Sequence, residues 1–258
     1  MRTNEAKRRI RAGEPTIGTW LGLASVLAAE QMAVSGFDWL TVDVEHAPTS
    51  WETAAAMCAV VGAHNVAPFI RVPSATDENI KRALDLGAMG IVAPMVTSPE
   101  QAQQVVRACK YPPQGVRSVA GGRNAAAWQT DGPTYYARAN DEIFICIQIE
   151  NVEAVERVDE ILAVPGLDCA FVGPQDLTAA LGLPPQLDSP HPSYNEALEK
   201  VLAAARKHNI GAGLMVATAD AARQRHAQGF SMISLAAEAR ILAAAAAQAV
   251  KEIKAAHA

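Results

Sequence analysis

Short apolar runs rich in β-branched and aromatic residues alternate with longer helical patterns along the whole chain. The runs predict strands at residues 16–23, 39–45, 67–72, 90–95, 142–150, 168–173, 211–216 and 231–235. Helical patterns follow most of them, for example at residues 26–35, 50–62 and 77–86, and a final helix begins near Glu238. The stretch 111–140 shows no clear period and is expected to be irregular.

This alternation is typical of βα units that form a parallel sheet. Eight units in 258 residues favour a closed (β/α)₈ TIM barrel, in a single domain spanning residues 1–258, over an open doubly wound sheet. No G-x-G-x-x-G follows the first strand and no G-x-x-x-x-G-K-[ST] occurs. We therefore expect neither a dinucleotide nor a nucleoside triphosphate, and no organic cofactor.

Composition and charge narrow the classes of partner. Half of the residues are apolar, 19% are charged and the net charge is −5, which is ordinary globular composition without the basic stripe of a nucleic-acid-binding protein. The absence of 18 consecutive apolar residues predicts no membrane partner. The four cysteines lie far apart in apolar or helical runs, which indicates reduced thiols and a cytoplasmic location.

Charged residues gather where the predicted strands end, and in a barrel this end carries the chemistry. Glu150 and Asp176 follow neighbouring strands, and their hard oxygens suit Mg²⁺ or Mn²⁺. The alternative is a structural salt bridge between one of them and Arg71. Asp43 lies three residues before His46, close enough to orient an imidazole for proton transfer.

Two further features complete the candidate chemistry. Arg71 offers a fork of donors suited to a carboxylate or a developing enolate oxygen, and backbone amides after Gly173 and Pro174 could bind an anion. No lysine falls in a predicted strand and no G-x-S-x-G occurs, so neither a Schiff base nor an acyl-enzyme is expected.

Several longer segments occur in the order found in the HpcH/HpaI family of metal-dependent pyruvate aldolases. They are GTWLGL at 18–23, GFDWLTVDVEHAP at 36–48, GAMGIVAPM at 87–95, YPPQGVRS at 111–118, QIE at 148–150 and FVGPQDL at 171–177. The chain resembles this family from about residue 16 to residue 250, which is nearly its whole length.

The resemblance implies how the site and the assembly are built. It implies a divalent metal (Mg²⁺, Mn²⁺ or Co²⁺) held by Glu150 and Asp176, with Gln148 beside it, and pyruvate bound through its carboxylate and keto oxygens. It also implies that Arg71 steadies the enolate, that Asp43 and His46 transfer protons, and that Trp20 lines the pocket. Asp85 would reach the site of a neighbouring subunit. The last helix would be exchanged between subunits of a homohexamer, a trimer of dimers.

Three segments depart from the pattern of the family. Gln175 stands where a small residue contacting the pyruvate carboxylate is common, residues 181–193 are rich in proline, and residues 234–238 replace the usual glycine and aspartate. Arg123 lies in a loop that also differs, where its side chain could bind an acidic acceptor. All of these bear on the substrate pocket rather than on the metal.

The leading hypothesis is a lyase that cleaves a 4-hydroxy-2-oxo acid into a 2-oxo acid, pyruvate or a close relative, and an aldehyde. One alternative on the same site is decarboxylation of oxaloacetate or citrate-lyase-like cleavage of a thioester, although no basic patch for coenzyme A is present. Another is a barrel that only binds a 2-oxo acid. The combination of Glu150, Asp176, His46 and Arg71 argues against the latter.

Overall fold

A closed barrel of parallel strands forms the centre of the molecule. The computed structural model describes residues 1–120 and 122–255, and residues 121 and 256–258 of the expected domain lie outside this part. Eight strands within it pair in the order β1 to β8, and β8 closes against β1. The strands are β1 (Thr16–Leu21), β2 (Trp39–Asp43), β3 (Ala67–Arg71), β4 (Gly90–Ala93), β5 (Phe144–Ile149), β6 (Cys169–Val172), β7 (Gly211–Val216) and β8 (Met232–Ala237). The predicted (β/α)₈ TIM barrel is confirmed.

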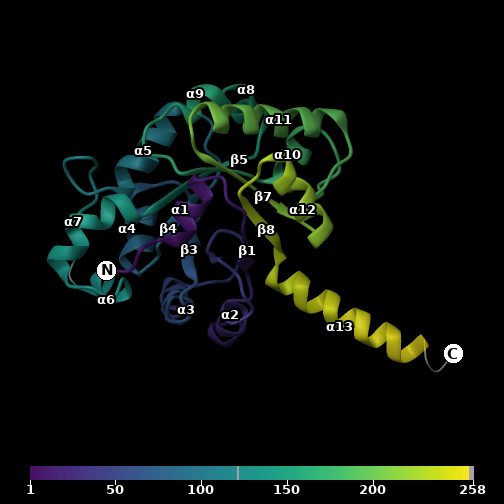
Figure 1. Ribbon diagram of the computed structural model, residues 1–258, viewed down its shortest axis with the longest axis horizontal. Coiled ribbons are helices and arrows are strands. Elements are labelled where there is room, and N and C mark those ends of the chain that lie inside the picture. The colour runs from purple at the N-terminus through teal and green to yellow at the C-terminus, as the bar shows by residue number, and fades with distance from the viewer. Residues whose placement is uncertain (121, 256–258) are drawn as a thin grey trace.

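Helices surround the barrel (Figure 1). They are α1 (Glu5–Arg11), α2 (Val26–Ala33), α3 (Trp51–Ala63), α4 (Asp77–Asp85), α5 (Pro99–Cys109), α6 (Arg123–Ala127), α7 (Gly132–Glu142), α8 (Val152–Glu156), α9 (Val158–Leu162), α10 (Pro174–Ala180), α11 (Pro192–Lys207), α12 (Ala219–Gln228) and α13 (Glu238–Ala255). The yellow helix α13 leaves the barrel and extends away from it (Figure 1). None of the helices in the described part combines the length and hydropathy that a membrane span requires.

Two helices, α6 and α7, lie where no helix was predicted, and the bounds of α1 were not predicted. α1 buries only Ala6 and Ile10, so its sequence shows little apolar periodicity. α6 and α7 lie in the stretch expected to be irregular. A local signal for α7 was present, because the side chain of Asp131 accepts a hydrogen bond from the backbone N–H of Thr134 and a proline occupies the first turn.

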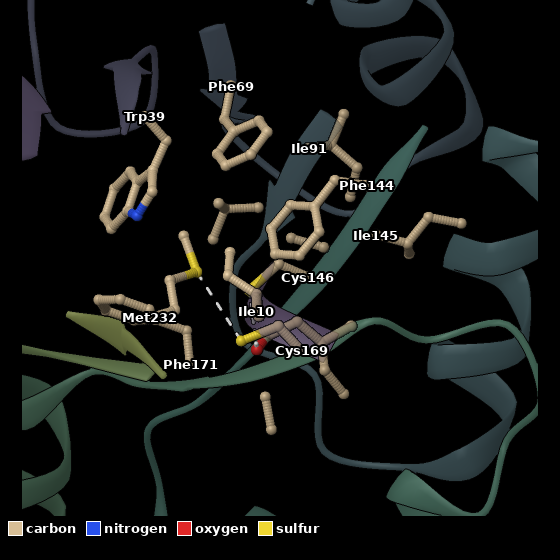
Figure 2. Close-up of a cluster of buried hydrophobic side chains, with 14 of the residues drawn as sticks. Ile10, Trp39, Phe69, Ile91, Phe144, Ile145, Cys146, Cys169, Phe171 and Met232 are labelled. Carbon is tan, nitrogen blue, oxygen red and sulfur yellow. Dashed lines mark hydrogen bonds between the residues drawn. The ribbon is translucent and has the colours of Figure 1, made fainter. Parts of the chain in front are cut away.

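Aromatic rings fill the interior of the barrel, and small residues make room for them. Figure 2 shows Trp39, Phe69 and Phe144 side by side, with ring centroids 6.1 Å apart for the first pair and 4.6 Å for the second. A Cβ atom at Gly18 would lie 2.1 Å from the Trp39 ring, and one at Gly90 would lie 2.5 Å from the Cβ of Phe144. Side chains cannot approach this closely, so glycine at these positions allows the close packing of the core.

Helix α1 is fastened to the amino end of the barrel by a buried carboxylate. Asp168, which is 1% exposed and directly precedes β6, lies 3.3 Å from Lys7 Nζ and 3.0 Å from Arg11 Nη1. Its other hydrogen bond comes from the backbone N–H of Ile145. Burial lowers the pKa of Lys7, and the charge of Asp168 opposes that shift. The carboxylate of Asp168 thus stabilises the charged form of the buried Lys7 side chain.

Replacing Asp168 by alanine should therefore destabilise the protein. Removal of one partner of a buried ion pair typically lowers the free energy of unfolding by about 3–5 kcal/mol, because the other charge stays buried. Urea unfolding followed by circular dichroism measures this change. Asp159→Ala is the matched control, since Asp159 binds Lys207 and His208 at the exposed surface and should leave the midpoint almost unchanged. Equal effects of the two variants would contradict the role given to Asp168.

Candidate active site

A cleft of about 230 Å³ opens at the carboxyl end of the barrel. Most of the predicted site residues line it, namely Trp20, Asp43, His46, Arg71, Gln148, Gly173, Pro174, Gln175 and Asp176. They come from strand ends that are far apart in the sequence and that the closed barrel brings to one rim. Glu150 is not part of this lining, but it accepts a hydrogen bond from Nε2 of Gln148, which is part of it.

Arg71 is held rigidly at the end of β3. Asp43 is its Cα partner in the β2–β3 register, and the two Asp43 carboxylate oxygens accept hydrogen bonds from Arg71 Nε at 3.0 Å and from Nη2 at 2.6 Å. Glu45 Oε2 lies 3.3 Å from Nη1, and the guanidinium stacks over the Trp20 ring at 4.5 Å. With three sides occupied, the guanidinium has a single orientation towards the cleft.

The imidazole of His46 does not bind Asp43, contrary to the sequence-based expectation. Asp43 Oδ1 instead accepts the backbone N–H groups of Glu45 and His46, at 3.0 and 3.2 Å. The turn after β2 and Arg71 thus satisfy the carboxylate completely. The His46 side chain is 65% exposed, and its Nε2 lies 3.8 Å from Glu45 Oε2. His46 stands at the mouth of the cleft as a group open to a substrate.

Glu150 is a buried carboxylate with few positive neighbours. Oε1 accepts the backbone N–H of Met95 at 2.8 Å, and Oε2 accepts Gln148 Nε2 at 2.8 Å. Burial raises its pKa to about 7, and the charges of Asp176 and Glu45 act in the same direction. The Met95 hydrogen bond and the charge of Arg71 oppose the shift only in part. At neutral pH such a group favours a nearby cation.

Gly173 sets the space that Glu150 occupies. A Cβ atom at this position would lie 2.3 Å from Glu150 Oε2, a distance that no pair of non-bonded atoms tolerates. Gly173 is also the residue before α10, so Pro174 enters the first position of that helix and Asp176 falls in its first turn. The short segment 173–176 therefore leaves room for the buried carboxylate of Glu150 and also carries the exposed carboxylate of Asp176.

These residues have the character of a cation site completed by ligands from outside the chain. Burial also raises the pKa of Glu45, a further acid beside the cleft. Arg71 already pairs with Asp43 and Glu45, and within residues 1–120 and 122–255 neither Glu150 nor Asp176 makes an ion pair. Gln148 Oε1 is buried and has no hydrogen-bond partner in the described part of the chain. Within the described residues no group of three or more acidic, histidine or cysteine side chains forms a ready metal cage, so two carboxylates would need water or substrate oxygens to complete a hard cation's shell.

Some residues of the site were missed by the sequence-based reasoning, and others lie elsewhere. Glu45 was overlooked as a site residue although it follows Asp43 in the same strand end. Asp85 lies at the end of α4 and binds Arg117 Nη2 at 2.6 Å. Arg123 donates to the backbone oxygen of Ala55 and does not line the cleft of its own chain. Its predicted contact with an acidic acceptor stays a prediction.

Gly173→Ala should disturb the carboxylate pair while preserving the barrel. The added methyl group must displace Glu150, and displacement of groups that support a metal ligand typically weakens metal affinity about 10- to 100-fold. Titration with Mn²⁺, followed by electron paramagnetic resonance, measures the affinity directly. The matched control is Gly132→Ala, where the nearest atom to a new Cβ is 3.9 Å away. Unchanged Mn²⁺ affinity in Gly173→Ala would contradict the assigned site.

Comparisons with known proteins agree with this geometry. The family model described as HpcH/HpaI aldolase/citrate lyase matches residues 16–245. A hydroxypyruvate/pyruvate aldolase from Deinococcus radiodurans is 40% identical over 246 residues, covering 95% of this chain and 87% of that protein. A 4-hydroxy-2-oxo-heptane-1,7-dioate aldolase from Escherichia coli is 35% identical, covering 94% and 92%.

Comparison with solved structures leads to the same family. An HpcH/HpaI aldolase/citrate lyase family protein from Burkholderia cenocepacia J2315 superposes with a TM-score of 0.91, at 37% identity, covering 98% of this chain and all of that one. Strand-end carboxylates, a fixed guanidinium and nearly full-length similarity thus lead to one conclusion. The chain belongs to the HpcH/HpaI aldolase/citrate lyase family and is a carbon–carbon lyase of the aldolase class.

Proposed function

We propose that the protein cleaves the C3–C4 bond of a 4-hydroxy-2-oxo acid to give an aldehyde and pyruvate or a close 2-oxo acid. In the reverse direction it condenses these two compounds. The observation that carries this proposal is a pair of carboxylates that make no ion pair within the described residues, Asp176 in the cleft with the fixed guanidinium of Arg71 and Glu150 hydrogen-bonded to Gln148 of the cleft lining. The relative from Escherichia coli, named for a 4-hydroxy-2-oxo acid, supports the substrate class.

Glu150 and Asp176 would hold a divalent cation, Mg²⁺, Mn²⁺ or Co²⁺. Carboxylate oxygens are the ligands that these hard cations prefer, and the unpartnered Gln148 Oε1 adds an acceptor for a water ligand. When bound, the cation would polarise the keto group of the substrate and offset negative charge on its oxygen. This chain would thus contribute the carboxylates of Glu150 and Asp176 as ligands, and Gln148 Oε1 as an acceptor for a water ligand.

Arg71 stabilises the charge that develops during cleavage. As the C3–C4 bond breaks, its electron pair moves towards the 2-oxo oxygen and produces an enolate. A guanidinium already oriented by Asp43 and Glu45 needs no rearrangement to donate to that oxygen. Trp20, beneath the guanidinium, and the backbone of Gly173, Pro174 and Gln175 form the surrounding substrate pocket.

His46 is the group that we assign to proton transfer. In the cleavage direction its imidazole accepts the proton of the C4 hydroxyl group, and the carbonyl of the aldehyde forms as C3–C4 breaks. Protonation of the enolate at C3 then gives the methyl group of pyruvate. The exposed ring at the mouth of the cleft is accessible for both steps. Asp43 acts indirectly, by holding Arg71 and the backbone of His46.

Assembly and location form a separate part of the proposal. We propose that residues 1–258 form one domain, located in the cytoplasm, where four buried free cysteines remain reduced. We also propose a homohexamer, a trimer of dimers, in which α13 packs on a second copy. Only Glu238 of α13 is buried in its own chain, while Leu242 and Ile253 are each 62% exposed. The role of Asp85 in a neighbouring site remains a prediction.

Exchange of pyruvate protons tests the chemistry without knowledge of the aldehyde. Metal-stripped protein in D₂O should lose the pyruvate methyl signal in proton NMR only after Mg²⁺, Mn²⁺ or Co²⁺ is restored. Glu150→Gln should reduce the exchange rate at least about 100-fold, the effect expected when charge stabilisation is lost. Glu153→Gln, an exposed change on α8, is the matched control. Normal exchange in Glu150→Gln would rule out the ligand assignment.

The assembly can be tested on the exposed face of α13. Leu242 and Ile253 lie about three helical turns apart and hence on one face, so glutamate at both positions should disrupt packing on another copy. Light scattering should give the mass of a hexamer for the wild type and a smaller mass for the double variant. Gln248→Glu controls for added charge on the same helix. A monomeric wild type would contradict the proposed assembly.

A further inference from the structure

One side of the cleft is not used by the proposed chemistry. Glu150 and Asp176 follow β5 and β6, and Arg71 ends β3, whereas the lining from β7 and β8 carries none of the reacting groups. On that side lie Met215, Ala237 and Arg240, with Leu187 from the segment between α10 and α11. Because β7 pairs with β6 and β8 closes the barrel against β1, this side lies next to the carboxylate pair and opposite β3, the strand that ends in Arg71.

Arg240 is the charged residue of this side, and its position is set by its own barrel. It is the third residue of α13, and Glu238, two residues earlier, is 3% exposed and accepts the backbone N–H of Leu23 at 2.9 Å. Ala237 pairs with Trp20 of β1 in the strand register. The first turn of α13 is therefore anchored beside the cleft, whatever surface the rest of the helix contacts.

The two arginines that line the cleft differ in their charge environment. Arg71 is paired with Asp43 and Glu45, so most of its charge is compensated. Arg240 is exposed and, across residues 1–120 and 122–255, makes no hydrogen bond or ion pair. The other lining residues of this side, Met215, Ala237 and Leu187, are apolar. An apolar wall ending in an unpaired guanidinium suits a short carbon chain with a terminal anion.

We propose that Arg240 is a specificity-determining residue that binds a carboxylate at the far end of the aldehyde. This inference rests on the proposed function. A 2-oxo acid end placed at Glu150, Asp176 and Arg71 would leave the remainder of the substrate to extend along Met215 and Leu187 to Arg240. The preferred substrates are then dicarboxylic 4-hydroxy-2-oxo acids, and the preferred acceptors are aldehydes that carry a carboxylate. Arg240 takes the part in acceptor binding that the sequence alone suggested for Arg123.

The test compares two acceptors of similar size, succinate semialdehyde with a terminal carboxylate and butanal without one. Condensation with pyruvate is measured with the full-length, metal-loaded protein, and the ratio of the two kcat/KM values is the readout. Arg240→Met keeps the length of the side chain but removes its charge. We expect it to lower the ratio about tenfold, the scale of one lost charge-assisted hydrogen bond. Arg240→Lys should retain most of the preference, and Arg223→Met, an exposed change on α12, is the matched control.

Pyruvate exchange in the same samples separates the possible failures. Exchange and condensation by the wild type, with a ratio that falls in Arg240→Met and persists in Arg240→Lys, support the inference. An equal loss of rate with both aldehydes, an unchanged ratio, or a wild type that favours butanal would overturn it while leaving the proposed function intact. A wild type that shows no metal-dependent exchange would overturn the proposed function, and the role of Arg240 with it.

Discussion

The pairing of Arg71 with Asp43 determines what the other charged groups at the mouth of the barrel can do. It follows from strand register, because the two residues are Cα partners at the ends of adjacent strands. It occupies both oxygens of Asp43 and, together with Glu45, most donors of Arg71. As a consequence Asp43 is not available to orient the His46 imidazole, which instead has Glu45 Oε2 3.8 Å from its Nε2. Within the described residues Glu150 and Asp176 also make no ion pair, so the same pair that fixes the guanidinium leaves these two carboxylates for the cation that we propose.

Keeping Glu150 buried opposes folding, and the surrounding structure only partly offsets that cost. Burial of a carboxylate without compensation costs several kcal/mol. The Met95 N–H and the Gln148 amide each supply one hydrogen bond, and Gly173 leaves room for the second oxygen. Met95 adopts a left-handed backbone conformation with a φ of 55°, which a non-glycine residue rarely takes. Strain and unsatisfied charge thus coincide at the proposed reacting centre, as is common in active sites.

The sequence predicted the features that depend on local patterns. Each strand is a buried apolar run, and the closed barrel follows from their number, so the strand ends and most of the cleft could be located. α1 could not be predicted from periodicity, since long-range ion pairs to Asp168 hold it in place. The orientation of His46 depends on competition between Arg71 and the imidazole for Asp43, which spacing alone cannot decide.

The division of the cleft explains how acceptor preference could change without loss of the chemistry. The groups proposed to act on the 2-oxo acid follow β2, β3, β5 and β6, whereas Met215 and Arg240 belong to β7 and α13. Substitution on the second side leaves the Arg71–Asp43 pair and the carboxylates in place. Arg240 also begins the helix that we propose packs on a second copy. In that assembly one helix serves both the interface and the acceptor side, so the geometry of the interface and the choice of aldehyde become physically coupled through the first turn of α13.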